Sequence, residues 1–215
     1  MGIMMLKMFS LEVKEVMGNN SDLNKKSGVQ LTNHMDPPES EYLVDSRDGN
    51  EYSIVDIGGQ IWMSENLRYI GYSNDSKHYS TYGGLYSWWE AQSVCPSGWH
   101  LPSDEEWQRL IRFLGGEKIA GARLKDTQSL LWQGQNSSNS SSSGFNALPA
   151  GYGNALSKDK LEKEGELARF WSSITSSGFE GTWAYYYQLH YKKGSMKKTN
   201  HHKDFKMSVR CTKDY

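Results

Sequence analysis

Residues 95–107 read Cys-Pro-Ser-Gly-Trp-His-Leu-Pro-Ser-Asp-Glu-Glu-Trp, and this stretch carries the clearest fold signal in the chain. Ser103 and Glu106 form a capping box, in which each side chain accepts a hydrogen bond from the other residue's backbone N–H. Two glycines, Gly115 and Gly116, are typical of the end of a helix. Between these signals the apolar residues recur at helical spacing: Trp107, Leu110, Ile111 and Leu114. We expect one amphipathic helix between Ser103 and Gly115.

The segments on either side of this helix predict mainly strands. Asp48-Gly49 lies between the apolar runs 42–44 and 51–57, which is a strong hairpin signal. Gly58-Gly59 then turns the chain into residues 60–63, so we expect a β-meander. Residues 84–94 have helical spacing and end before Cys95-Pro96. Three later segments have the composition of strands: 169–173, 182–190 and 207–211.

The N-terminal part of the chain differs in composition from the rest. Residues 18–40 are polar and include Asn19-Asn20-Ser21 and Pro37-Pro38, and such a composition buries little apolar surface. We predict a flexible tail or linker over residues 1–40 and a single domain over residues 41–215. Charged residues interrupt 1–16, which therefore lacks the continuous apolar core of a secretory signal.

The composition of the whole chain argues against two classes of partner. The 215 residues include 24 Lys and Arg against 25 Asp and Glu, whereas a dedicated nucleic-acid-binding protein shows a basic excess. The mean hydropathy is -0.72, and no apolar stretch approaches the ~20 residues that a membrane helix needs. We expect a mixed α and β protein that binds no nucleic acid and has no membrane span.

The two cysteines, Cys95 and Cys211, are far apart in the sequence. Neither has a second cysteine nearby, which argues against a Cys-x-x-Cys redox motif or a zinc ribbon. Their number and spacing leave three possibilities open: two buried thiols, two reactive thiols or one long-range disulfide.

Several blocks of the sequence, taken together, resemble one known family. They are DG at 48–49, GGQIWMSENLRY at 58–69, CPSGWHLPSDEEW at 95–107, ALPAGY at 147–152, FWSS at 170–173 and SVRC at 208–211. In this order, across about residues 41–215, they resemble the Fibrobacter succinogenes major paralogous domain. Residues 89–107, from Trp89-Glu90-Ala91 to the Glu106-bearing helix, are also similar to C-type lectin-like domains. His100-Leu101-Pro102 with Glu106-Trp107 is similar to the sulfatase-modifying enzymes of the same wider fold.

The resemblance implies a fold and a location. The fold would be α+β and C-type lectin-like, with two helices against a small twisted antiparallel sheet and a long irregular loop region. In that superfamily the cysteine after the first helix pairs with one in the last strand, which implies a Cys95–Cys211 disulfide. Disulfides are typical of oxidising compartments, so we expect a secreted or cell-envelope protein. We attribute the lack of a signal peptide in the given sequence to a truncated or misassigned start.

We expect neither a metal ion nor a cofactor. The resemblance implies that C-type lectins hold calcium and sugar through Glu-Pro-Asn or Gln-Pro-Asp strings and a Trp-Asn-Asp string, and none of these occurs here. Residues 45–50 superficially resemble a calcium loop, but Arg47 stands where such a loop needs an oxygen ligand. We interpret this segment as a turn and expect any ligand binding to be independent of calcium.

Aromatic residues are the candidates for a ligand-binding surface. Trp183, Tyr185 and Tyr187 alternate along a predicted strand and therefore share a face, and Trp132 precedes a Ser-rich segment. Flat rings of this kind can stack on sugars while their polar edges stay hydrated. Packing in the core or across strands is the competing interpretation. Core packing is also what we predict for four other tryptophans: Trp62, Trp99, Trp107 and Trp171.

Basic residues gather near the C-terminus. One interpretation is contact with an anionic glycan or an envelope phosphate, and the other is a solvated hairpin loop around Gly194-Ser195. The adjacent His201-His202 would point to opposite sides of a strand, which makes a zinc site from both improbable. The lysines concerned are Lys192, Lys193, Lys197, Lys198, Lys203 and Lys206.

The sequence favours a binding protein over an enzyme. The resemblance implies that sulfatase-modifying enzymes use a closely spaced cysteine pair, which this chain lacks, and no nucleophile elbow, P-loop or HExxH motif occurs. We predict no catalytic residues. The hypothesis is a non-catalytic extracellular or cell-envelope binding module for a glycan or a protein, independent of calcium. The alternatives are a structural or adhesin-like display domain without a small-molecule site, and a divergent enzyme related to sulfatase-modifying enzymes.

Overall fold

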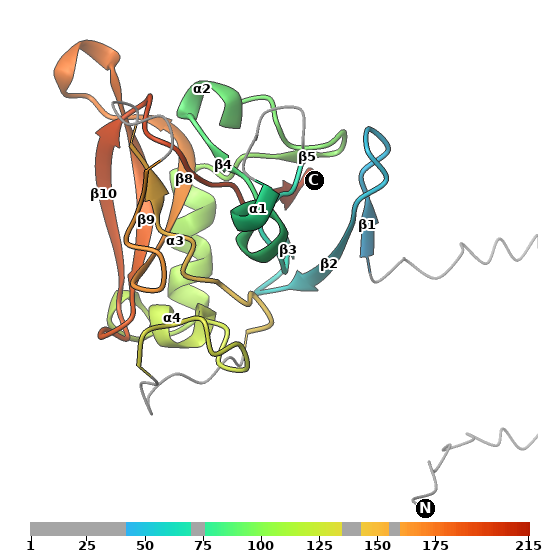
Figure 1. Cartoon of the computed structure of the whole chain (residues 1–215), viewed down its shortest axis with the longest axis horizontal. Helices are drawn as coiled ribbons and strands as arrows, with labels where there is room; N and C mark the ends of the chain where they lie inside the picture. The colour runs from blue at the N-terminus through green and yellow to red at the C-terminus, as the bar shows by residue number, and fades with distance from the viewer. Residues whose placement is uncertain (1–41, 70–75, 135–142, 155–159) are drawn as a thin grey trace, which may run out of the picture. The chain divides into compact units, whose positions relative to one another are not determined.

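A computed structural model describes residues 42–69, 76–134, 143–154 and 160–215 (Figure 1). The tail or linker predicted over residues 1–40 lies outside these ranges. None of the helices in the described ranges combines the length and the apolar character needed to cross a membrane.

Most of the strands belong to two five-stranded sheets. The first sheet has the order β1-β2-β3-β12-β5, with β1 Tyr42–Val44, β2 Glu51–Asp56, β3 Ile61–Met63, β12 Thr212–Lys213 and β5 Trp99–His100. The second has the order β10-β9-β8-β11-β4, with β10 Met196–His202, β9 Trp183–His190, β8 Leu167–Thr175, β11 Met207–Ser208 and β4 Leu85–Tyr86. A third, two-stranded sheet pairs β6 Tyr152–Gly153 with β7 Leu161–Glu162.

The helices are short. They are α1 Ser76–Tyr82, α2 Trp88–Ala91, α3 Asp104–Phe113 and α4 Glu117–Leu124, and a 3-10 turn spans Phe179–Gly181. The predicted α+β class is confirmed. In detail the fold is richer than two helices on one small antiparallel sheet, because the described ranges hold four helices and three sheets. One pairing, between β8 and β11, is parallel.

Helix α3 forms as the opening motif predicts. Ser103 accepts a hydrogen bond from the Glu106 backbone, and Glu106 accepts one from the Ser103 backbone. The helix ends before Gly115 and Gly116, whose φ angles of 90° and 92° suit glycine rather than other residues. Figure 1 shows α3 lying along the sheet formed by β8, β9 and β10. Its apolar face is buried, with the Trp107 ring 5.1 Å from the ring of Tyr187.

The predicted β-meander is also confirmed. Strands β1, β2 and β3 pair in antiparallel order, with Leu43 opposite Tyr52 and Val55 opposite Trp62. The turn at 45–50 is closed by backbone hydrogen bonds from Asp45 to Asn50 and from Gly49 to Asp45.

The helix predicted over residues 84–94 is mostly wrong. Leu85 and Tyr86 form strand β4, which pairs with β11. Pairing within the sheet overrides the helical spacing of the apolar residues. Only residues 88–91 are helical. They follow a second capping box, between Ser87 and Glu90.

In the second sheet, both faces of β8 and β9 contribute buried residues to the core. Phe170 of β8 and Tyr187 of β9 pack in the cluster around α3, while Trp171 and Tyr186 pack in a cluster with α2 and β3. The predicted core placement of Trp62, Trp107 and Trp171 is confirmed, and Trp99 is partly buried against the second cluster.

The chain passes from one sheet to the other through residues 209–211, which we call the crossing segment. Cys211 forms a disulfide with Cys95, which follows α2, so the pairing implied by the resemblance is present. The guanidinium of Arg210 is fully buried and donates to Asn66 Oδ1 at 2.7 Å, to the Met63 carbonyl at 3.0 Å and to the Phe145 carbonyl. The crossing segment is therefore held both covalently and by hydrogen bonds.

We expect reduction of the disulfide to lower the free energy of unfolding by about 2–5 kcal/mol, because the bond closes a loop that spans more than half of the chain. Guanidinium denaturation with and without a reductant measures this difference. The double variant Cys95→Ala/Cys211→Ala is the control, and a reductant should not change its free energy of unfolding. An unchanged unfolding midpoint on reduction of the wild-type protein would contradict the prediction.

Candidate binding site

The β9–β10 ribbon, residues 183–202, is the frame of the candidate site. The two strands pair along their length, from Trp183 opposite His202 to Leu189 opposite Met196. Within the described ranges β10 is the outermost strand of its sheet, as Figure 1 shows. The basic run at 197–198 therefore lies on a strand and not in a solvated loop, which corrects the loop interpretation for these residues.

Helix α4 packs against the turn of this ribbon. Gly121 faces the turn so closely that a Cβ added there would lie 2.4 Å from the Ser195 carbonyl oxygen. The Ala122 backbone N–H donates to the Gly194 carbonyl at 2.8 Å. The close contact between α4 and the backbone of the ribbon's turn therefore requires a glycine at position 121.

Lys125 holds the turn from inside. Its buried ammonium donates to the carbonyls of His190 and Lys193, both at 2.8 Å, and lies 5.1 Å from the ring centre of Trp132. Burial lowers the pKa of Lys125 to about 8. The partners of the Lys125 ammonium are thus two backbone carbonyls and an aromatic ring, not a carboxylate. These contacts stabilise the turn of the ribbon.

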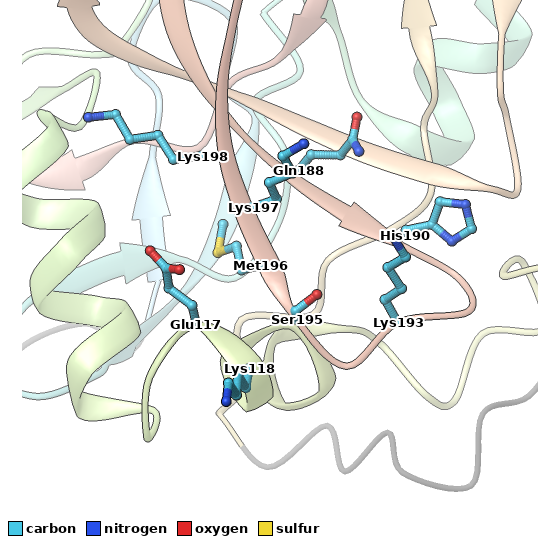
Figure 2. Close-up of a pocket in the computed structure, with 9 residues that line it drawn as sticks. All are labelled: Glu117, Lys118, Gln188, His190, Lys193, Ser195, Met196, Lys197 and Lys198. Carbon is cyan, nitrogen blue, oxygen red and sulfur yellow. The ribbon is translucent and has the colours of Figure 1, made fainter.

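A pocket of about 420 Å³ opens between α4 and the ribbon. Figure 2 shows that its lining comes from the first residues of α4, from both strands and from their turn. The residues are Glu117, Lys118, Gln188, His190, Lys193, Ser195, Met196, Lys197 and Lys198. Four lysines and one carboxylate are therefore among the lining residues.

The electrostatics of this pocket are positive. Within the described ranges only Lys198 among the four lysines has an ion pair, with Asp104 Oδ2 at 2.8 Å. The pKa of His190 is lowered, first by burial and then by the charges of Lys193, Lys125 and Lys192, although Glu166 opposes them. Burial and the neighbouring lysine charges therefore both favour the neutral form of His190.

The predicted aromatic platform is only partly exposed. Tyr187 is fully buried and Trp132 is 7% exposed, so neither offers a ring face to a ligand. Tyr187 shares a face with Tyr185, as alternation predicts, but α3 covers that face at Tyr187, whose hydroxyl donates to Asp104. Trp183 and Tyr185 are partly exposed, so these two residues are the ones of the predicted platform that a ligand can reach.

Each of these two rings already has a neighbour. Trp183 stacks on His201 with the ring centres 5.5 Å apart and the planes 10° from parallel. The Lys198 ammonium lies 4.0 Å from the ring centre of Tyr185. Tyr185 is not among the residues that line the pocket, and like Trp183 it lies toward the end of β9 away from the ribbon's turn.

Two other basic residues of the C-terminal run lie elsewhere. Lys203 is buried, with its ammonium 4.0 Å from the ring centre of Trp88 and 4.6 Å from that of Trp89, so it is not part of a solvated loop. Lys206 is exposed and its backbone pairs with Gly153. The basic run therefore divides into residues that line the pocket and residues, such as Lys203 and Lys206, that lie outside it.

In the turn at 45–50, the Arg47 side chain binds the carboxylate of Asp45. The Arg47 side chain donates to both carboxylate oxygens of the buried Asp45, at 2.9 and 2.6 Å, and to the Val94 carbonyl. Within the described ranges no group of three His, Cys, Asp or Glu residues is placed to hold a metal ion.

A second, smaller pocket of about 240 Å³ lies between the segment after β3 and the loop before β6. Of its charged groups, Glu65 and Arg68 form an ion pair with each other, and Asp126 accepts hydrogen bonds from two backbone N–H groups. Asn66 in its wall donates to the Tyr82 carbonyl. These groups already have partners within the protein, so this pocket offers a ligand fewer partners than the lysine pocket does.

One cluster of titratable groups lies outside both pockets. Nδ1 of His100 lies 2.5 Å from Asp214 and Nε2 lies 2.8 Å from Glu106, the residue that caps α3. Burial alone would lower the pKa of His100, but the hydrogen bonds to Asp214 and Glu106 outweigh it and the pKa is raised. Through these contacts at both ring nitrogens, His100 joins β5, α3 and the C-terminal residues.

A family model described as the Fibrobacter succinogenes major domain matches residues 55–213. The chain belongs to this family. Neither the search of curated proteins nor that of solved structures gave a match. The ribbon, α4 and both pockets all lie within the Fibrobacter succinogenes major domain, so the candidate site belongs to the domain itself.

We expect Gly121→Ala to lower the free energy of unfolding by about 1–3 kcal/mol, because the new Cβ would overlap the Ser195 carbonyl. The greater helix propensity of alanine would offset part of this loss. Urea denaturation measures the change. Gly178→Ala is the matched control, since a Cβ there would meet nothing within 4 Å, and it should change stability little. Equal stability of the two variants would contradict the close contact of α4 with the ribbon.

We expect His100→Gln to remove a stability contribution that depends on pH. The folded-state pKa of His100 is raised above 6.5, so its contribution is fully present below about pH 6.5 and is lost as the pH rises through the folded-state value. The contribution should not exceed about 1 kcal/mol, because the side chain is 37% exposed and solvent screens the interaction. Denaturation at pH 6 and pH 9 should show a larger difference between variant and wild type at pH 6. A larger difference at pH 9 would refute it.

Proposed function

We propose that this domain is a non-catalytic binding module that works outside the cytoplasm, on the cell envelope or secreted, and that its ligand is a glycan bound without calcium. The observation that carries the proposal is the pocket at the turn of the β9–β10 ribbon, a concave surface rich in hydrogen-bond donors, together with the partly exposed ring of Tyr185 farther along β9. Such a combination of aromatic and polar groups suits a sugar, which has both apolar faces and hydroxyls.

The disulfide supports the proposed location. Cys95 and Cys211 are the two cysteines of the chain, and both are joined in the bond. A structural disulfide is typical of an oxidising compartment. The same pairing supports the finer fold proposal, a C-type lectin-like domain, because it joins the segment after α2 to the segment before the last strand. It also occupies both thiols, which supports a non-catalytic role.

A second candidate ligand is a protein, and one observation favours it. Strand β10 is seven residues long and lies at the edge of its sheet within the described ranges. An edge strand can pair with an extended peptide. A display domain without a small-molecule site is the remaining alternative.

We expect the oxidised chain to bind a subset of glycans on an array equally well with calcium and with a chelator. Tyr185→Ala should weaken that binding about tenfold, because a stacked aromatic contact is lost, and Trp183→Ala should weaken binding of longer oligosaccharides. Titration calorimetry on a positive glycan measures both changes.

Matched controls are Tyr215→Ala and Trp89→Ala, which remove exposed aromatic rings outside the ribbon. They should leave glycan affinity unchanged. Binding that requires calcium would contradict the proposed calcium independence. No binding to any glycan in either condition would refute the glycan proposal and favour a protein ligand or a display role.

A further inference from the structure

Resting on the glycan-binding function proposed above, we propose that the pocket between α4 and the β9–β10 ribbon recognises an anionic glycan, through a carboxylate, sulfate or phosphate group carried by the sugar. Lys193 and Lys197 are the residues that contact this group.

The first argument is the uncompensated charge. Lys118, Lys193 and Lys197 line the pocket, are exposed, and have no ion pair within the described ranges. Glu117 is the single carboxylate in the lining. Like charges that share a concave surface repel one another, and an anion bound among them relieves that repulsion. The pocket therefore gains more from an anionic ligand than from a neutral one.

The second argument concerns the neutral polar groups of the lining, which also present donors. His190 accepts a hydrogen bond at Nδ1 from the Lys192 backbone at 3.1 Å, and this places the proton of the neutral ring on Nε2. Gln188 accepts one at Oε1 from Arg169 at 2.9 Å, which leaves its amide NH₂ as the group available to a ligand. Apart from Glu117 and Ser195, the polar lining thus offers only N–H donors. Anionic oxygens accept hydrogen bonds and donate none, so they complement this lining.

The third argument explains why the anion is carried by a sugar. Cations lie against aromatic rings of the ribbon: next to the turn Lys192 is 5.1 Å from the ring centre of Tyr191, and farther along β9 Lys198 is 4.0 Å from that of Tyr185. A sugar with an acidic substituent can place its ring against the aromatic surface and its charge against the adjacent ammonium. A free inorganic anion would use only the second of these contacts.

An acidic peptide is less suited to this surface. A peptide that paired with the edge of β10 would have to fit between the lysine side chains that flank it, and edge lysines oppose strand addition.

The test measures binding of the full oxidised chain to matched polysaccharides by calorimetry or biolayer interferometry. Dextran sulfate is compared with dextran, and polygalacturonate with its methyl ester, so that each pair differs only in charge. We expect the charged member of at least one pair to bind at least about tenfold more tightly than the neutral member. Its affinity should fall as NaCl rises from 50 to about 500 mM, because salt screens exposed charges.

The double variant Lys193→Glu/Lys197→Glu should weaken binding of the charged member by about 10- to 100-fold. Lys160→Glu/Lys206→Glu is the matched control, because it changes the net charge equally at exposed lysines outside the pocket. The control should keep wild-type affinity. Far-ultraviolet circular dichroism and the unfolding midpoint verify that both double variants are folded. Equal losses in the two double variants would overturn the assignment to the pocket.

Further outcomes separate this inference from the function on which it rests. Neutral polysaccharides that bind as tightly as their charged partners would overturn the anionic class and leave the glycan function standing. Failure of all polysaccharides, charged and neutral, would refute both. Polyglutamate that binds more tightly than every polysaccharide, with the same loss in Lys193→Glu/Lys197→Glu, would overturn the glycan class in favour of an acidic protein. If inorganic sulfate at micromolar concentration displaces the charged polysaccharide, the sugar contributes nothing to binding. That outcome would also overturn the inference of an anionic glycan.

Discussion

The buried guanidinium of Arg210 is the constraint on which the rest of this domain depends. A charge without water must find hydrogen-bond acceptors, and Arg210 finds them on residues 63 and 66 and on residue 145, two segments that are far apart in the sequence. Both segments must therefore be in place before the crossing segment is stable. Burial lowers the pKa of Arg210, and the rings of Phe145 and Phe170 lie against the cation. The neighbouring disulfide then ties the same segment to Cys95, so hydrogen bonds and a covalent bond act at one point.

The position of the candidate site depends on the crossing segment. Ser208 pairs with Phe170 of β8, β8 pairs with β9, and β9 pairs with β10, so the ribbon is placed strand by strand from the crossing segment outward. Helix α4 and Lys125 then close the turn of the ribbon from the other side. The backbone of the pocket is thus defined by regular pairing, while its charged groups are long side chains that can adjust to a ligand. A pre-organised frame of this kind reduces the ordering cost of binding.

Local signals in the sequence predicted the elements that local interactions stabilise. The capping box at Ser103 and the Asp48-Gly49 turn each act within a few residues, and both elements form as expected. Strand β10 was missed because lysine and asparagine are depleted in strands, and only pairing with β9 makes residues 196–202 extended. Helix α4 was missed because it has a glycine cap without a side-chain hydrogen bond. Alternation correctly predicted that Tyr185 and Tyr187 share a face. It could not show that α3 covers one of them, since that depends on tertiary packing.

The near-zero net charge of the chain does not describe the electrostatics of the pocket. At physiological salt, exposed charges act over about 8 Å, so only nearby groups set the potential inside the pocket. Those groups are mostly lysines, while Lys125 and Lys203 are buried against tryptophan rings and Arg210 lies in the core. Nearly equal totals of acidic and basic residues therefore coexist with a concave surface that is mainly positive. Argument from net charge alone disfavours a long polyanion such as a nucleic acid, which needs an extended basic surface, but it does not disfavour an acidic sugar, which needs only one pocket.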